Sequence, residues 1–110
     1  MKVQLKKGLL DIIVLAALLE GDSYGYKLIQ DTRELVEISE STLYPILRRL
    51  EDNRFLVSYK EEFNGRLRKY YRITAAGKKQ IDSFLSEWKY MNRIYQYIKE
   101  KRRDEQKSFL

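Results

Sequence analysis

The side chains available for chemistry in this sequence are hydroxyls, carboxylates and cations, because it contains no cysteine and no histidine. Their absence excludes thiolate nucleophiles, Ser-His arrangements and metal sites built from sulfur or imidazole. The carboxylates are scattered, and the one in an apolar run, Asp11, is interpreted as a helix-surface residue. We therefore expect neither an enzyme nor a bound cofactor.

The charged side chains are unevenly distributed along the chain. Residues 1–53 carry 7 basic and 9 acidic side chains, whereas residues 54–110 carry 15 and 7, for a net charge of +6 overall. This asymmetry indicates that a polyanion is bound mainly by the second half. The alternative is a basic face that is merely solvated.

Three groups of side chains have the donors that phosphate oxygens and base edges accept. The candidate DNA-binding residues are Ser23, Tyr24 and Lys27 in the first group, Ser41, Thr42, Tyr44, Arg48 and Arg49 in the second, and Arg66, Arg68 and Lys69 in the third. Tyrosines in such positions also serve as packing residues, and arginines as solvated charge. Whether these side chains contact DNA or serve in packing and solvation depends on the helices and strands that carry them.

Helical periodicity predicts two helices for the first half of the chain before residue 37. The first, over residues 5–19, is apolar nearly all round, which suggests burial against a partner subunit as well as its own core. Gly21 ends it, and Asp22 or Ser23 is expected to cap a second helix over residues 24–36. Gly25 in its first turn permits either a close helix approach or a phosphate near the backbone.

A third helix and a hairpin follow. The third helix begins at Ser39 and buries a single stripe of residues, which are Leu43, Ile46, Leu47 and Leu50. Asn64-Gly65 between two strand-like runs predicts a two-residue type I′ turn. That turn pairs Phe63 with Arg66, Glu61 with Arg68 and Tyr59 with Tyr70 across the hairpin.

A last helix is predicted from the Thr74 cap to about Arg102, a length of about 42 Å. Its apolar residues alternate at spacings of three and four, a heptad seam that one small domain cannot cover. We therefore predict a homodimer. The expected interface residues are Leu9, Ile13, Ile81, Phe84, Trp88, Met91, Tyr95 and Ile98.

The order of elements, three helices, two strands and a helix, is that of a mainly α (α+β) winged helix-turn-helix. Residues 1–73 form the expected DNA-binding region, residues 74–103 a C-terminal dimerisation helix packing with helix 5–19, and residues 104–110 a frayed tail. No stretch is long and apolar enough to span a membrane, and we expect a cytoplasmic protein.

Three runs in the sequence resemble the PadR family of transcriptional regulators. They are Glu20–Tyr26 (EGDSYGY), Ser41–Leu50 (STLYPILRRL) and Arg68–Gly77 (RKYYRITAAG). The resemblance covers about residues 9–88 and points to the family's short branch, which has a single C-terminal helix. Leu67 departs from it, because many members carry proline there. The resemblance implies a homodimer in which the first and last helices exchange contacts, and usually repression of a nearby gene.

The expected function is thus sequence-specific binding of double-stranded DNA, at a pseudo-palindromic operator. Similarity to some short PadR regulators also implies a planar aromatic effector held by Phe84, Trp88 and Met91 at the dimer seam. The alternative, that Trp88 only fills the dimer core, stays open. The competing function is a winged-helix adaptor that binds protein rather than DNA.

Overall fold

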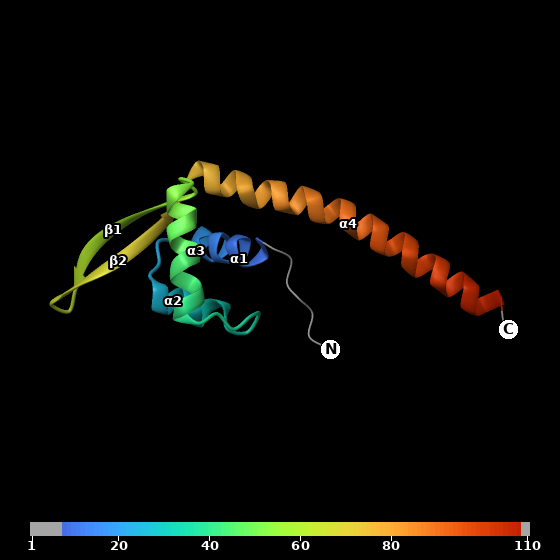
Figure 1. The fold of residues 1–110 in the computed structure, drawn as a ribbon, viewed down its shortest axis with the longest axis horizontal. Coiled ribbons are helices and arrows are strands. Elements are labelled where there is room, and N and C mark those ends of the chain that lie inside the picture. The colour runs from blue at the N-terminus through green and yellow to red at the C-terminus, as the bar shows by residue number, and fades with distance from the viewer. Residues whose placement is uncertain (1–7, 109–110) are drawn as a thin grey trace.

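The computed structural model describes residues 8–108 as a helical body from which a hairpin and one long helix project in different directions (Figure 1). The elements are α1 (Leu9–Ala17), the 3-10 turn η1 (Leu18–Glu20), α2 (Gly25–Thr32), α3 (Glu40–Asp52), β1 (Leu56–Phe63), β2 (Arg66–Ile73) and α4 (Ala75–Ser108). This order confirms the predicted fold class. Within residues 8–108, no helix has the length and apolar content needed to cross a bilayer. Residues 5–7 of the expected first helix lie outside the described range.

The hydrophobic core forms where the first three helices meet the inner face of the hairpin and the start of α4. Its buried residues are Val14, Leu15, Leu18, Leu28, Ile38, Leu43, Ile46, Leu47, Leu50, Leu56, Tyr71 and Ile81. All four residues of the predicted inner stripe of the third helix are among them, which confirms that periodicity. The core therefore fixes α3 by one face and leaves the opposite face uncovered.

Side-chain hydrogen bonds accompany the boundaries of α2 and α3. Ser39 caps α3 as predicted, accepting a hydrogen bond from the Thr42 amide at 3.3 Å. The second helix, however, ends at Thr32 rather than at Val36. The Thr32 hydroxyl donates to the Leu28 carbonyl at 2.9 Å, and such back-bonding competes with continuation of a helix.

The hairpin has the register that the Asn64-Gly65 turn predicted. Both turn residues have positive φ, 51° and 79°, as a type I′ turn requires. Tyr59 pairs with Tyr70, Glu61 with Arg68 and Phe63 with Arg66. Ser23 forms an isolated antiparallel bridge with Tyr71, so the segment before α2 is attached to the strand β2.

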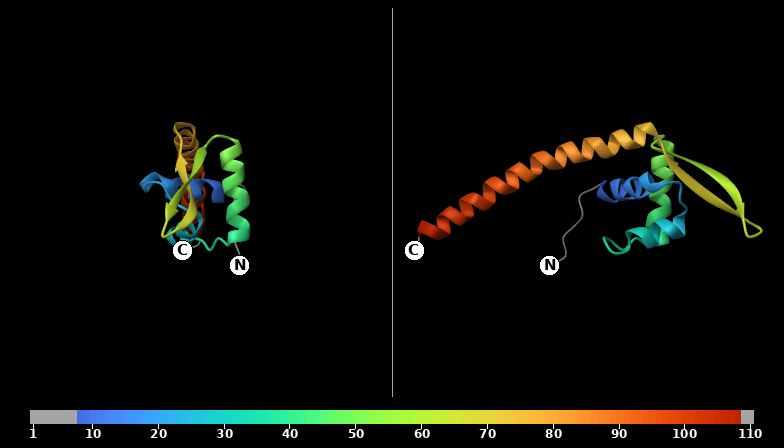
Figure 2. Two further views of the ribbon diagram at one scale, coloured as in Figure 1. Left: turned by 90° about the vertical axis from the view of Figure 1, so that its left-hand side faces the viewer. Right: turned by 180° about the vertical axis from the view of Figure 1, so that it is seen from behind.

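The last helix, α4, starts beside the body and then runs away from it, as the right-hand view in Figure 2 shows. Thr74 caps it as predicted, accepting from the Gly77 amide at 3.1 Å. It continues to Ser108, where fraying was expected from residue 104 onward. The i,i+3 ion pair of Arg102 with Glu105, at 2.9 Å, supports helix in this stretch. Residues 109–110 of the expected tail lie outside the described range.

Candidate nucleic-acid interface

The uncovered face of α3 carries most of the second candidate group. Ser41, Tyr44 and Arg48 recur at helical spacing, and all three are exposed. Within the described residues, Arg48 forms no ion pair, so its guanidinium keeps all of its donors for a ligand. This face is exposed and mostly polar.

A cluster of hydroxyls marks the start of α3. Ser39 Oγ lies 3.0 Å from Ser41 Oγ and donates to Thr42 Oγ1 at 3.1 Å. The cluster sits at the positive end of the helix dipole, among backbone N–H groups that have no intrahelical acceptor. Hydroxyl and amide donors grouped in this way suit a phosphate oxygen of a nucleic acid backbone.

Tyr44 joins α3 to α2 through a close approach at Gly25. A Cβ placed on Gly25 would lie 2.6 Å from the Tyr44 hydroxyl oxygen, so no other residue fits without displacing the ring. Gly25 is itself buried. Of the two roles left open for this glycine, the structure supports the close helix approach.

Arg49 is held differently from its neighbour Arg48. Its Nη2 lies 2.6 Å from Asp11 Oδ1 of α1, and its Nε donates to Asp11 Oδ2 at 3.2 Å. The Asp11 carboxylate thereby raises the pKa of Arg49 above its ordinary value. The two arginines therefore present different chemistry: one is free, and the other is fixed side-on.

The start of α2 corrects two sequence expectations. Tyr24, not Asp22 or Ser23, is the N-cap residue, and no side chain caps the helix. Ser23 is only 2% exposed, because its bridge to Tyr71 draws it into the body, so its hydroxyl faces no ligand. Lys27 is exposed but forms an ion pair with Asp31 at 2.8 Å. Of the first candidate group, Tyr24 and Lys27 remain accessible.

The cations of the hairpin divide between its two faces. Residues paired across an antiparallel ladder share a face, so Arg66 and Arg68 lie on the face of Tyr59 and Tyr70, whereas Lys69 lies on the opposite one. Arg68 is stacked between two rings, 4.0 Å from the centroid of Tyr24 and 4.1 Å from that of Phe63. Arg66, beside the turn, forms no ion pair within residues 8–108.

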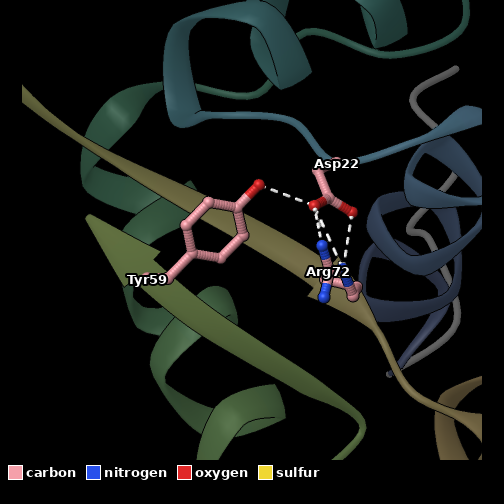
Figure 3. A network of polar contacts seen from close by, with 3 residues as sticks. All are labelled: Asp22, Tyr59 and Arg72. Carbon is pink, nitrogen blue, oxygen red and sulfur yellow. Dashed lines mark hydrogen bonds and ion pairs between the residues drawn. The ribbon is translucent and has the colours of Figure 1, made fainter. Parts of the chain in front are cut away.

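A polar network attaches this hairpin to the segment before α2 (Figure 3). Asp22 accepts a hydrogen bond from the Tyr59 hydroxyl at 2.6 Å and from Arg72 Nη2 at 2.8 Å. The Arg72 and Tyr59 hydrogen bonds, in that order, lower the pKa of Asp22, and the carboxylate raises the pKa of Tyr59. Tyr70 completes the contact, stacking on Tyr59 with ring centroids 5.5 Å apart.

The other face of the hairpin is attached to α3. Glu51 accepts a hydrogen bond from Ser58 of β1, and Lys69 of β2 lies 3.9 Å from the same carboxylate. Because a separation of 3.9 Å in an exposed pair is loose, Lys69 stays available to a stronger anion. Between them, Asp22 and Glu51 fix the hairpin relative to α2 and α3.

Sequence reasoning missed the acids that perform this positioning. Asp11, Asp22 and Glu51 each bind a residue at least seven positions away. Periodicity reveals only neighbours within one element, so it gave no signal for these pairs. The one relevant signal was the excess of acidic over basic side chains in residues 1–53, which was interpreted only as part of the charge asymmetry of the chain.

The expected dimer residues lie along an apolar surface shared by α1 and α4. A groove of about 600 Å³ runs between them, lined by Leu9, Ile12, Ile13, Ala16, Ala17, Asp31, Thr32, Leu35, Val36, Ile81, Phe84 and Leu85. Beyond it, four seam residues of α4 stand exposed, which are Trp88, Met91, Tyr95 and Ile98. Trp88 stacks on Phe84 with ring centroids 5.8 Å apart. Half of the Trp88 surface nonetheless remains open.

Comparison with solved structures finds the same architecture in bacterial regulators. A transcriptional regulator from Clostridium thermocellum is 40% identical, with a TM-score of 0.71, over 80% of this chain and 90% of that one. A PadR family regulator from Clostridium difficile is 32% identical, with a TM-score of 0.73, over 79% and 94%. Bacillus subtilis PadR, solved with operator DNA, shares the fold at 23% identity and a TM-score of 0.66, over 70% and 46%.

The family comparison covers the body, the hairpin and the start of α4. The family model of the transcriptional regulator PadR-like family matches residues 14–83, which is more than half of the chain. This agrees with the resemblance carried by the three sequence runs and with the expectation of a regulator rather than an enzyme. The chain belongs to the transcriptional regulator PadR-like family.

Proposed function

We propose that this chain is a sequence-specific DNA-binding regulator that places α3 in the major groove of an operator. The observation that carries the proposal is the outer face of α3, where Arg48 and a cluster of hydroxyls stand uncovered on a helix fixed by its opposite face. A helix of this width enters the major groove, and a free guanidinium donates to guanine O6 and N7. The operator complex of Bacillus subtilis PadR supports the same use of this fold.

The hairpin serves as the wing. Arg66 beside the turn and Lys69 on the side of α3 would meet the phosphate backbone or the adjacent minor groove. Residues 1–73 then form the DNA-binding region. A two-stranded hairpin is marginally stable when isolated, so the wing's position depends on its contacts with the body: Leu56 and Tyr71 in the core, and the polar contacts of Asp22 and Glu51.

A second copy of this chain is the partner we propose for the exposed seam of α4 and the groove beside α1. The region 74–103 would then be the dimerisation helix. A homodimer has two-fold symmetry, so its operator is pseudo-palindromic, with half-sites about one helical turn apart, roughly 34 Å. Binding of such a dimer over a promoter blocks transcription, and we propose that the regulator is a repressor.

Release of the operator by a small planar ligand is the last element of the proposal. Half of Trp88 is exposed beside Phe84 and Met91. Aromatic and flexible side chains of this kind line adaptable apolar pockets. In a homodimer, both copies of the seam would approach the two-fold axis.

The test is a titration of the protein with a duplex from its own promoter region and with a random duplex of equal length. We expect preference for the promoter duplex and an affinity that falls steeply with salt, since neutralised phosphates release counterions. Light scattering in the same buffer is expected to give twice the 13.3 kDa chain mass. A dimer without affinity for either duplex would favour the protein-binding adaptor instead.

A further inference from the structure

The bidentate contact of Asp11 with Arg49 joins two helices that have different tasks in the proposed function. Asp11 belongs to α1, outside the helix-turn-helix pair, and its neighbours Ile12 and Ile13 line the apolar groove. Arg49 belongs to α3, which faces DNA. The Arg49 side chain is 53% exposed, while that of Asp11 is 21% exposed. The carboxylate is thus partly covered, and the guanidinium has an open side.

An ion pair this exposed has little to do with holding the fold together, because water screens it and ordering the arginine costs entropy. Its geometry matters more than its strength. Two parallel contacts to one carboxylate fix the plane and the direction of a guanidinium, which a single contact does not. Arg48, one position earlier and without an ion pair in residues 8–108, has no such restraint.

The atoms that Asp11 leaves free are those that suit a base edge. Asp11 occupies Nε and Nη2 of Arg49, so Nη1 and the outer hydrogen of Nη2 remain as an end-on pair of donors. Guanine accepts such a pair through O6 and N7 in the major groove. Ser41, Pro45 and Arg49 follow at four-residue spacing along the exposed side of α3, which puts Arg49 on the proposed DNA-facing side.

We propose that Asp11 is a specificity-determining positioning residue, which holds Arg49 so that its free edge reads one guanine of the operator. The inference rests on the proposed function and extends it to a residue outside the elements that contact DNA. Asp11 itself does not touch DNA. A carboxylate near the phosphates weakens attraction to any duplex, so its contribution is to selectivity and not to affinity as such.

The experiment is a double-mutant cycle of Asp11→Ala, Arg49→Ala and the double variant. Fluorescence anisotropy gives the affinity of each dimer for the operator and for a random duplex. We expect the ratio of the two affinities to fall about tenfold in each single variant, the loss of one bidentate base contact. The double variant is expected to lose no more than either single one, because both changes remove the same contact.

Asp82→Ala is the matched control, since it removes the same charge from an exposed position of α4, outside α3 and the hairpin. It is expected to raise the affinity for both duplexes alike and to leave their ratio unchanged. Asp11→Asn, which keeps the shape of the side chain, replaces Asp11→Ala if the latter melts early or dissociates by light scattering. Replacing the contacted G·C pair of the operator should lower the affinity ratio of the parent protein. The ratio of the Asp11→Ala variant should stay the same.

The inference is overturned if Asp11→Ala and Asp11→Asn keep the parent's ratio, or if the losses in the two single variants multiply in the double one. A role in stability alone would lower the melting temperature and leave the ratio intact. A parent protein that shows no preference for the operator would instead contradict the proposed function itself.

Discussion

Arginine occupies three environments on the proposed DNA-binding side, and they determine which guanidiniums face a ligand. Arg48 is free on α3, Arg68 lies between the rings of Tyr24 and Phe63, and Arg72 is bound by Asp22. A count of basic residues treats the three as equal. Their surroundings leave the donors of Arg48 unpaired within residues 8–108, whereas Arg68 and Arg72 also make contacts that join the hairpin to the segment before and at the start of α2.

Arg48→Ala is therefore expected to weaken operator binding by about 1–3 kcal/mol, the cost of one lost base contact. Anisotropy titration at fixed salt measures it. Arg103→Ala, which removes the same charge near the far end of α4, is the control and should change the affinity only slightly. Equal losses in the two variants would mean that Arg48 acts only through its charge.

Titration of Asp22 gives a pH-dependent contribution to stability. Its pKa is lowered in the folded protein by Arg72 and Tyr59. The contribution is therefore complete above the unfolded pKa of about 3.9 and is lost as the pH falls through the lower folded value. Asp22→Asn removes it, so the parent's advantage in free energy of unfolding should shrink as the pH is lowered below about 4. An advantage that is constant from pH 7 to pH 3 would contradict this assignment.

At the scale of elements, local signals predicted the parts but not their mutual placement. Asn64-Gly65 gave the hairpin register, and the stripe from Leu43 to Leu50 gave the buried face of α3. Ser23 was misplaced because its burial depends on a bridge to Tyr71, forty-eight positions later in the numbering. No pattern within one element encodes such a contact. The end of α2 at Thr32 coincides with a side-chain hydrogen bond to the Leu28 carbonyl, which hydrophobic periodicity does not reveal.

Two arginines of the wing allow a test that separates attraction by charge from placement by tertiary contacts. Arg66→Ala is expected to weaken binding to all duplexes and to reduce the salt slope by about one charge. Arg68→Lys keeps its charge but loses the planar stacking on Tyr24 and Phe63. That variant should lose affinity with an unchanged salt slope, because the wing is less firmly placed. The paired titrations over a salt series would contradict this view if both variants changed the slope alike.

At the scale of the whole molecule, the length of α4 is the feature that a single chain leaves unexplained. The helix has 34 residues, and its C-terminal part extends well beyond the body (Figure 1). The apolar seam along that part is exposed. Large exposed apolar surfaces of this kind mark interaction sites. The proposed homodimer covers the seam and sets the distance between two copies of α3, so assembly and DNA recognition depend on the same helix.

Met91→Glu tests the seam, because it would bury an unpaired charge in the dimer. We expect dissociation at micromolar concentration, measured by light scattering, or loss of the folded state, measured by circular dichroism. Gln96→Glu adds the same charge to an exposed position of α4 outside the heptad seam and should leave the dimer intact. A Met91→Glu variant that remains a stable dimer would place the interface elsewhere.

A ligand at the seam would act on the whole molecule, by favouring one separation of the two α3 helices. It shifts the affinity for DNA only by the difference between its affinities for the two arrangements. Trp88 is the sole tryptophan of the chain, so its fluorescence reports on the seam alone. Planar cationic dyes are expected to quench it and to weaken operator binding over the same concentration range. Quenching without any change in DNA affinity would leave Trp88 as a core residue of the dimer, and the regulator would respond to no ligand at this place.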